Sequence, residues 1–254
     1  MNLIMGSDTA WCVGCGERKP KRKMDFVRYD LGFCRACCNG NLHKPQPFID
    51  EKKRLDFLMS PFQYSEPVRN ALLAFKFDAC VGYRYIFAHY INQMLDAFMA
   101  QEERDWIHTY NVVIPVPLSA RRLRERGYNQ AELVAREVST HIGIPLDTEM
   151  LYKIHHTGRQ SEVSWENRAA NVRGCYQVNE LAVRGKHIIL IDDIYTSGAT
   201  MAECADTLKA AGAAGVMGIT VARTIRREKT EAQLMFEELE AMRNPRRIPK
   251  VAFR

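Results

Sequence analysis

The sequence lacks a long uninterrupted hydrophobic run. Its most apolar long segment, YRYIFAHYINQMLDAFMA at 83–100, is broken by Arg, His, Asn, Gln and Asp side chains. A membrane-spanning helix needs about 20 consecutive, mostly apolar residues. The segment therefore favours an amphipathic helix, and we expect no membrane span. Internal repeats and low-complexity stretches are also missing, which excludes solenoid and fibrous architectures.

The first residues, MNLIMGSDTAWC, lack both the basic start and the apolar core of a secretion signal. We therefore expect a cytoplasmic protein. In a reducing compartment, the eight cysteines indicate metal ligands or free thiols before disulfides.

Charge of one sign is not strongly in excess. The 254 residues include 36 Lys and Arg against 30 Asp and Glu, a formal net charge of +6. This balance indicates only that anionic partners such as phosphates or nucleic acid are tolerated. With 46% hydrophobic and 26% charged residues, the composition is that of an ordinary globular protein.

Five of the cysteines fall in the first forty residues, as the pairs CVGC and CRAC plus Cys38. Two C-x-x-C pairs are typical of a tetrahedral zinc site. We predict that residues 1–44 form a zinc-binding module in which a structural Zn²⁺ has four thiolate ligands: Cys12, Cys15, Cys34 and Cys37. Cys38 leaves the fourth ligand open to an alternative, and the cysteines could also be unligated thiols. We interpret the basic ERKPKRK segment between the pairs as a solvated loop in preference to a surface that recognises nucleic-acid bases.

Residues 45–223 alternate between helical and strand patterns. Short β-branched runs at 112–116, 186–192 and 215–223 predict buried strands, and amphipathic segments between them predict helices. This alternation is typical of a parallel α/β sheet. Residues 224–254 differ: eight basic and five acidic residues give them a net charge of +3. We expect a charged C-terminal extension.

The segment IILIDDIYTSGAT at 188–200 carries the chemistry. Asp192 and Asp193 follow four apolar residues, so we expect them where a buried strand ends and ligands bind α/β sheets. The following loop leads into a helix whose N–H groups can hold a phosphate. It consists of Tyr195, Thr196, Ser197, Gly198, Ala199 and Thr200. The aspartates can accept hydrogen bonds from sugar hydroxyls. Together these features suit a ribose 5-phosphate.

This arrangement resembles the phosphoribosyl pyrophosphate (PRPP) motif of type I phosphoribosyltransferases. Three further stretches resemble the ComF/GntX family of competence protein F-like proteins: the paired C-x-x-C module, IPVPLSARRLRERGYNQAELVA and TGRQSEVSWENRAANVRGCY. The resemblance runs from Cys12 to Arg223. It implies a type I phosphoribosyltransferase-like parallel sheet flanked by helices and preceded by a small zinc-ribbon-like module.

The resemblance also implies site residues and partners. Asp192 and Asp193 would be catalytic, and the 195–200 loop would bind substrate together with Arg121, Arg122, Lys153 and Arg159. Mg²⁺ would arrive with PRPP. The family has arginines near Lys153 and His155, where this chain departs from it. Members are tied to DNA uptake in natural transformation, so single-stranded DNA or a competence or helicase-type protein is an implied partner.

Three hypotheses follow. The chain is a phosphoribosyltransferase that releases pyrophosphate to a nucleobase or another nitrogen nucleophile. Alternatively, it is a weakly catalytic or non-catalytic member that assists DNA uptake through partners. Finally, it is a zinc-dependent DNA- or partner-binding accessory protein on the same fold. The intact pocket motif favours the first two, and the basic tail and zinc module favour the last two.

Overall fold

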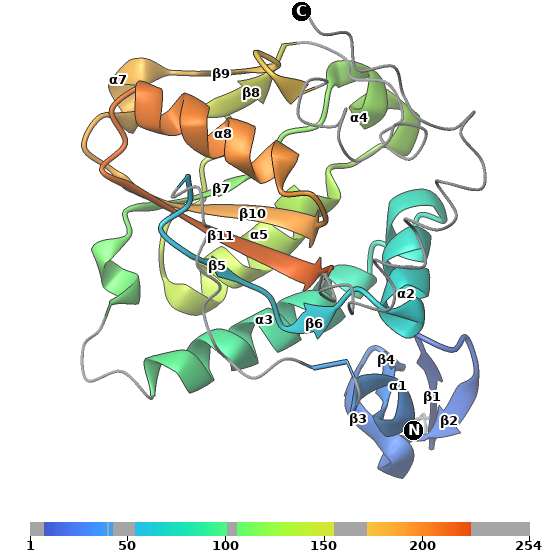
Figure 1. Cartoon of the computed structure of the whole chain (residues 1–254). Coiled ribbons are helices and arrows are strands. Elements are labelled where there is room, and N and C mark those ends of the chain that lie inside the picture. Colours follow the sequence, from blue (N-terminus) through green and yellow to red (C-terminus); the bar gives the residue numbers. More distant parts are fainter. Residues whose placement is uncertain (1–7, 40, 43–53, 101–105, 155–171, 225–254) are drawn as a thin grey trace, which may run out of the picture. The chain divides into compact units, whose positions relative to one another are not determined.

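The computed structural model describes residues 8–39, 41–42, 54–100, 106–154 and 172–224. A parallel five-stranded sheet lies at the centre of this part of the chain (Figure 1). Its strands are β5 (Leu58–Met59), β6 (Phe62–Gln63), β7 (Val112–Pro115), β10 (His187–Tyr195) and β11 (Gly215–Arg223). β10 pairs with β7 on one side and with β11 on the other, and β11 also pairs with β5 and β6. The predicted parallel α/β sheet is confirmed.

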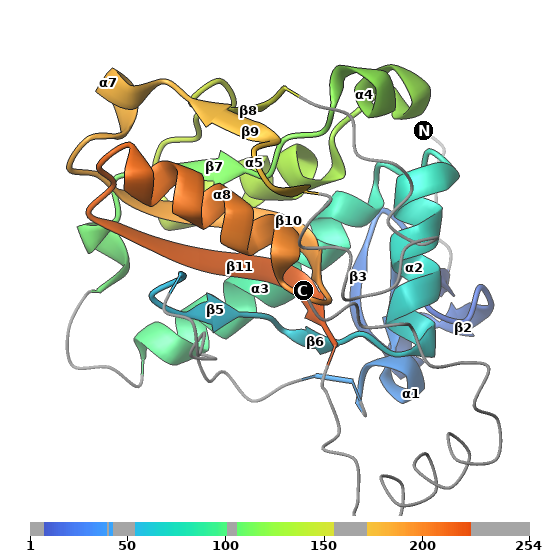
Figure 2. The same ribbon diagram turned by 45° about the horizontal axis from the view of Figure 1, so that its top comes forward.

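Helices cover both faces of the sheet. They are α3 (Tyr83–Met99), α5 (Gln130–Ile142) and α8 (Ala199–Ala210), whereas α2 (Glu66–Phe77) packs against α3. Alternate residues of β10 point to opposite faces, as a strand requires. Ile189 and Ile191 belong to the cluster that includes α3 and α5, whereas Ile188 and Leu190 pack in the cluster that includes α8. The sheet therefore separates two hydrophobic layers, with α8 on one face and α3 and α5 on the other (Figures 1 and 2).

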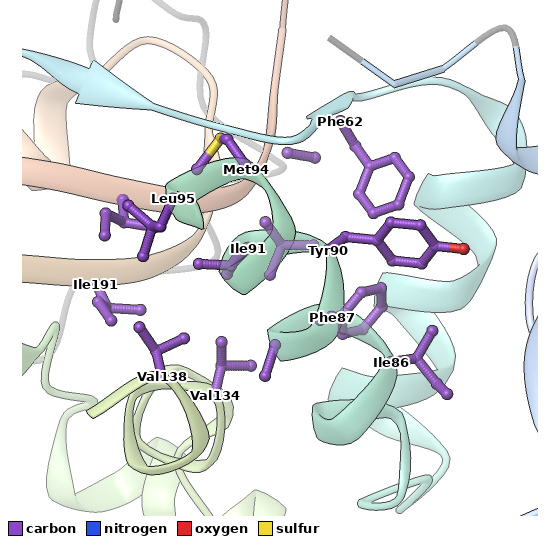
Figure 3. Packing of buried hydrophobic residues seen from close by; sticks show 14 of the residues in the cluster. Phe62, Ile86, Phe87, Tyr90, Ile91, Met94, Leu95, Val134, Val138 and Ile191 are labelled. Carbon is purple, nitrogen blue, oxygen red and sulfur yellow. The ribbon is translucent and has the colours of Figure 1, made fainter. Parts of the chain in front are cut away.

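Close packing of α3 and α5 against the sheet forms the larger layer (Figure 3). Ile91 of α3 and Val134 and Val138 of α5 are at most 1% exposed, as is Ile191 on the strand. Helix α5 begins and ends where its sequence indicates. The Asn129 side chain accepts a hydrogen bond from the Ala131 N–H at 3.1 Å, and Gly143 closes the helix at φ 71°.

The remaining elements lie at the edges of this sandwich. They are the short helices α4 (Ala120–Arg126) and α7 (Glu180–Val183), a single-turn 3-10 helix at Ile107–Thr109, and the antiparallel pair β8 (Leu151–Lys153) and β9 (Tyr176–Val178); a second 3-10 turn, Lys21–Lys23, belongs to the cysteine-rich region described next. None of the described helices is both long and apolar enough to cross a membrane.

The cysteine-rich region forms a small sheet of its own, in the order β2-β1-β4-β3, followed by one helical turn. Its elements are β1 (Thr9–Cys12), β2 (Arg18–Pro20), β3 (Met24–Arg28), β4 (Leu31–Cys34) and α1 (Arg35–Cys38). Tyr29 and Asp30, which join β3 to β4, both have positive φ, 52° and 57°. Two such residues in a two-residue connection are typical of a type I′ hairpin turn.

Helix α3 binds this region to the central sheet. The Tyr90 hydroxyl donates to Asp25 Oδ2 at 2.9 Å, and the Cys38 thiol donates to the Tyr90 oxygen at 3.5 Å. The Phe26 ring stacks on His89 with 3.5 Å between ring centroids. The first compact unit accordingly extends over Met1–Thr224, and the second unit, Ile225–Arg254, lies outside the described residues. The domain boundaries drawn from the sequence at 44/45 and 223/224 remain predictions.

One strand differs from its predicted length. We predict from the sequence that the second buried strand ends at Asp192, but β10 continues to Tyr195. The reason is its long neighbour: Asp192 pairs with Thr220, Ile194 with Ala222 and Tyr195 with Arg223. The aspartates therefore lie within the strand, where the ladder to β11 fixes the direction of each side chain.

Candidate functional site

A cavity of about 270 Å³ opens at the carboxyl edge of the sheet, beside the last residues of β10. β7 stops at Pro115, which pairs with Ile191, and the Val116 N–H donates to the Ile191 carbonyl at 2.8 Å. β10 runs on past this point, so among the described strands none pairs with it on the β7 side beyond Ile191. The difference in strand length exposes Asp192, Asp193 and the loop to one space.

Asp193 is a buried carboxylate held by side chains from two helices. Only 5% of the residue is exposed. Lys76 Nζ of α2 lies 2.7 Å from its Oδ2, and Gln130 Nε2 of α5 donates to the same oxygen at 2.9 Å. Because a buried charge without a partner costs several kcal/mol, this arrangement explains why an aspartate is tolerated inside the sheet.

Asp192 lies in a different environment. Its Oδ1 accepts a hydrogen bond from the Asp193 backbone N–H at 2.8 Å, and the residue is half-buried on the cavity wall. Burial, and secondly the negative charge of Asp193, raise the pKa of the Asp192 carboxyl from 3.8 to about 7. The two neighbouring aspartates are thus not equivalent: one has a lysine partner and the other faces the cavity.

The loop after β10 turns at a glycine directly into helix α8. Gly198 has φ 74° and precedes α8 directly, and a Cβ added there would lie 2.3 Å from the Tyr195 hydroxyl oxygen. No other residue type fits this position without a shift. The Ser197 hydroxyl accepts from the Ala199 N–H at 3.4 Å. All six residues from Tyr195 to Thr200 line the cavity, and the positive end of the α8 dipole faces the same space.

Four cationic side chains line the cavity: Lys76, Arg122, Arg126 and Lys153. Lys153 Nζ donates to the Tyr176 hydroxyl at 3.2 Å and lies over the same ring at 4.9 Å. Burial, followed by the charge of Arg122, lowers the pKa of Lys153. Burial also lowers the pKa of Arg126, against the opposing effect of Asp193. With two aspartates opposite four cations, the cavity suits a ligand that carries several negative charges.

The structure brings most of the predicted substrate residues together, with two exceptions. Arg121 is absent from the cavity wall; its exposed guanidinium pairs instead with Glu125 one turn along α4, at 2.7 Å. Arg159 lies outside the described residues.

Several cavity residues were missing from the predicted site, among them Lys76, Arg126, Gln130 and Tyr176. Arg126 was visible as part of the arginine-rich run at 121–126. Lys76 had no comparable signal, because a lysine on an amphipathic helix is usually a solvated surface residue. Only the tertiary contact between α2 and β10 reveals its role.

The four predicted metal ligands form one cluster. The sulfur atoms of Cys12, Cys15, Cys34 and Cys37 all lie within 4.8 Å of one another. Ligands of a tetrahedral Zn²⁺ at about 2.3 Å would lie about 3.8 Å apart, so a single ion fits with a small contraction.

The electrostatics of the cluster favour a cation. Burial raises the pKa of Cys37, and the charge of neighbouring thiolates adds to the rise. The Cys34 N–H donates to Cys12 Sγ at 3.3 Å, as is common around metal-bound thiolates. Cys38, the alternative fourth ligand, lies outside the cluster and contacts Asp25 and Tyr90 instead.

Comparison with known proteins agrees with this geometry. A family model described as "Phosphoribosyl transferase domain" matches residues 126–237. DNA utilization protein YhgH of Salmonella typhimurium is 27% identical over 209 residues, which cover 78% of this chain and 87% of the relative. Competence protein F of Haemophilus influenzae is 27% identical over 213 residues, covering 79% and 85%. Competence protein ComFC of Bacillus subtilis is 32% identical over 170 residues, covering 65% and 63%.

These relatives support placing the chain in the ComF family. Its sheet is that of a phosphoribosyltransferase-like domain, preceded by a cysteine module that could hold a metal ion. Among solved structures, the glutamine PRPP amidotransferase from B. subtilis is 24% identical, with a TM-score of 0.30. That match covers 43% of this chain, which spans only 22% of the amidotransferase.

The candidate metal site of this chain can be tested by elemental analysis. We expect about one zinc ion per chain and a clear loss of zinc in Cys15→Ser. Because Tyr90 connects the module to α3, the thermal transition of the whole unit should also fall to lower temperature. Cys80→Ser, which lies outside the cluster, is the matched control and should keep its zinc. Unchanged zinc content in Cys15→Ser would contradict the assignment.

The Lys76–Asp193 pair should contribute more to stability than a surface pair. Lys76→Met leaves a buried carboxylate with only Gln130 as partner, so we expect a loss of roughly 3–5 kcal/mol in the free energy of unfolding. Lys209→Met is the matched control, because its 3.1 Å pair with Asp56 is about one-third exposed; it should cost less than about 1 kcal/mol. Urea unfolding measures both, and equal losses would refute the structural role of Lys76.

The raised pKa of Asp192 predicts that this residue lowers the stability of the folded protein by an amount that depends on pH. Between pH 3.8 and about 7, the unfolded chain loses the carboxyl proton while the folded chain retains it, so stability falls as pH rises. Asp192→Asn keeps the Oδ1 acceptor and removes the charge. It should stabilise the protein by up to about 4 kcal/mol at about pH 8, and by almost nothing at about pH 4.

Denaturant unfolding at the two pH values measures this difference. Asp206→Asn, on the outer part of α8 with its carboxylate 48% exposed, is the control and should change stability by less than about 1 kcal/mol at either pH. A destabilised Asp192→Asn at the higher pH would show that the charge is compensated in the folded protein.

Proposed function

We propose that the cavity binds PRPP. One observation carries the proposal: an anion-binding loop at the start of α8, two aspartates and four cations all line the same space. The 5-phosphate would lie in the Tyr195–Thr200 loop, where backbone N–H groups and hydroxyls can donate to it. The ribose hydroxyls would donate to the carboxylates of β10, chiefly to Asp192, because Asp193 already accepts from Lys76 and Gln130.

The pyrophosphate of the ligand would face Arg122 and Lys153, on the side of the cavity that α4 and β8 supply. The donor set also fits Mg²⁺, which prefers carboxylate, phosphate and water oxygens and would reach the site on the phosphates of PRPP. Asp192 is the carboxylate available to hold it, directly or through water. Burial, followed by the charge of Arg122, lowers the pKa of Lys153, and a polyanion bound beside this side chain would favour its charged form.

The reaction that this arrangement supports is phosphoribosyl transfer. A nitrogen nucleophile forms a bond to ribose C1, the bond from C1 to the pyrophosphate oxygen breaks, and the electron pair leaves with pyrophosphate. The nitrogen then gives up its proton to solvent or to a neighbouring base. The protein contributes by holding both partners in place and by stabilising the departing anion with Arg122 and Lys153.

We further propose that this activity supports DNA uptake. Relatives of similar length are named for DNA utilisation and for competence. A second candidate function is an accessory role that needs no transfer reaction, in which the zinc module contacts single-stranded DNA or a helicase-type partner. The observation in its favour is a surface stack between the module and α3: the Arg28 guanidinium lies over Tyr85 of α3 at 4.2 Å and over Tyr29 at 5.3 Å, and Tyr29 is 70% exposed.

Calorimetric titration of the full chain with PRPP and Mg²⁺ tests the proposal. We expect saturable binding of one ligand per chain. Arg122→Gln should weaken it roughly tenfold, since a charge-assisted hydrogen bond contributes about 1.5–3 kcal/mol. Arg121→Gln is the matched control on the same helix, because this side chain points away from the cavity to Glu125; it should bind within about twofold of the parent.

Release of pyrophosphate in the presence of candidate acceptors separates the two functions. PRPP binding with pyrophosphate release identifies a transferase, and PRPP binding without release identifies a PRPP-responsive accessory protein. If the parent chain shows no PRPP affinity with Mg²⁺ present, the phosphoribosyl proposal fails and the accessory function becomes the better explanation.

A further inference from the structure

An exposed aromatic ring lies at the rim of the cavity. Phe77, the last residue of α2, is 65% exposed. Its neighbour Lys76 lines the cavity, and the Arg126 guanidinium lies over the Phe77 ring with 5.0 Å between the guanidinium carbon and the ring centroid. Single exposed hydrophobic residues are common, so exposure alone is no evidence of a site. The guanidinium above the ring is the feature that needs an explanation.

A chain of polar contacts connects this pair to the aspartate. Arg126 Nη1 donates to Gln130 Oε1 at 2.9 Å, and Gln130 Nε2 donates to Asp193 Oδ2 at 2.9 Å. On the other side, Lys76 binds the same Asp193 oxygen at 2.7 Å and is covalently adjacent to Phe77. Both groups are therefore connected to the Asp193 carboxylate. The Phe77 ring is connected through Lys76 of α2, and the Arg126 guanidinium through Gln130 of α5.

This arrangement holds the guanidinium over one face of the Phe77 ring at the mouth of the cavity. Arg126 is partly withdrawn from water, and a cation–π contact is stronger when the cation is desolvated. The ring contributes a large apolar surface with only two side-chain torsions, and most of that surface still faces solvent. A planar aromatic ligand could stack on such a surface, whereas an aliphatic amine or ammonia would gain little from it.

We propose that Phe77 and Arg126 form a stacking subsite for a planar aromatic ring, which lies beside the ribose of the ligand in the cavity. The inference rests on the proposed function, because it places this ring on the acceptor side of the phosphoribosyl site. Asp193, Lys76 and Gln130 then act as positioning residues for the subsite. The free heteroaromatic base and a base within a single strand offer the same stacking face, so both are possible sources of the ring.

The direct test is base binding by the full chain in the presence of PRPP and Mg²⁺. The probes are adenine, hypoxanthine and uracil, with 5,6-dihydrouracil as the non-aromatic match of uracil. Phe77→Ala should lower base affinity by at least about fivefold, since stacking of one base on an aromatic side chain is worth about 1–3 kcal/mol. Phe77→Tyr should retain it. Both variants should bind PRPP like the parent, because the ring lies outside the phosphoribosyl cavity.

A fluorescent reporter gives an independent readout of stacking. Phe77→Trp should be quenched when a planar base binds. Leu181→Trp, at a 91% exposed position on α7, is the control reporter and should not respond beyond the background of the three native tryptophans. An oligo(dA) strand and an abasic strand of equal length, each compared with free adenine, then show which source of base the subsite takes.

The outcomes separate this inference from the proposed function. Base binding that depends on Phe77 in a chain without PRPP affinity would support the subsite and refute PRPP binding. PRPP binding with no affinity for any base or strand would refute the subsite and leave the PRPP site intact. The subsite is also refuted if Phe77→Ala binds bases as the parent does, or if uracil and 5,6-dihydrouracil bind equally well.

Discussion

The arrangement of the site depends on neutralising the negative charge of one buried carboxylate. Asp193 lies within a parallel strand, where the neighbouring ladder fixes its direction and the surrounding layer excludes water. The strand can carry this charge only because Lys76 and Gln130 reach it from two different helices. Those contacts bring α2 and α5 to the carboxyl edge of the sheet, and with them Phe77 and Arg126. A local electrostatic requirement thus determines which side chains surround the cavity.

The same compensation gives the two aspartates separate roles. Asp193 is ion-paired, whereas Asp192 faces the cavity and has a strongly raised pKa. A site that keeps one carboxyl partly desolvated sacrifices stability at neutral pH, and such unfavourable groups are concentrated where proteins bind ligands. The strand β7 completes this design by ending at Pro115, because a longer β7 would pair with the last residues of β10 and fill the space that a ligand needs.

The cysteine module depends on a second electrostatic requirement. Burial, followed by the neighbouring cysteines, raises the pKa of Cys37 in this cluster. The module shares the core of the central domain through Phe26, Phe33 and Tyr90. A metal ion and this shared core would together supply what a region of about 40 residues usually cannot supply alone.

The sequence by itself determined the features that depend on local order. Hydrophobic runs predicted the three main strands, the Asn129 and Gly143 caps bounded α5, and the spacing of two C-x-x-C pairs indicated the thiol cluster. It also located the Asp192–Thr200 segment, because a strand, a glycine turn and a helix start are contiguous in the chain. Tertiary structure alone decided the rest. The length of β10 depends on β11, the direction of Arg121 away from the cavity depends on the rotation of α4, and the Lys76–Asp193 pair joins residues far apart in sequence. Sequence patterns indicate contacts between residues that are close in the chain, whereas the partner of a buried charge is whichever side chain lies near it in the folded structure.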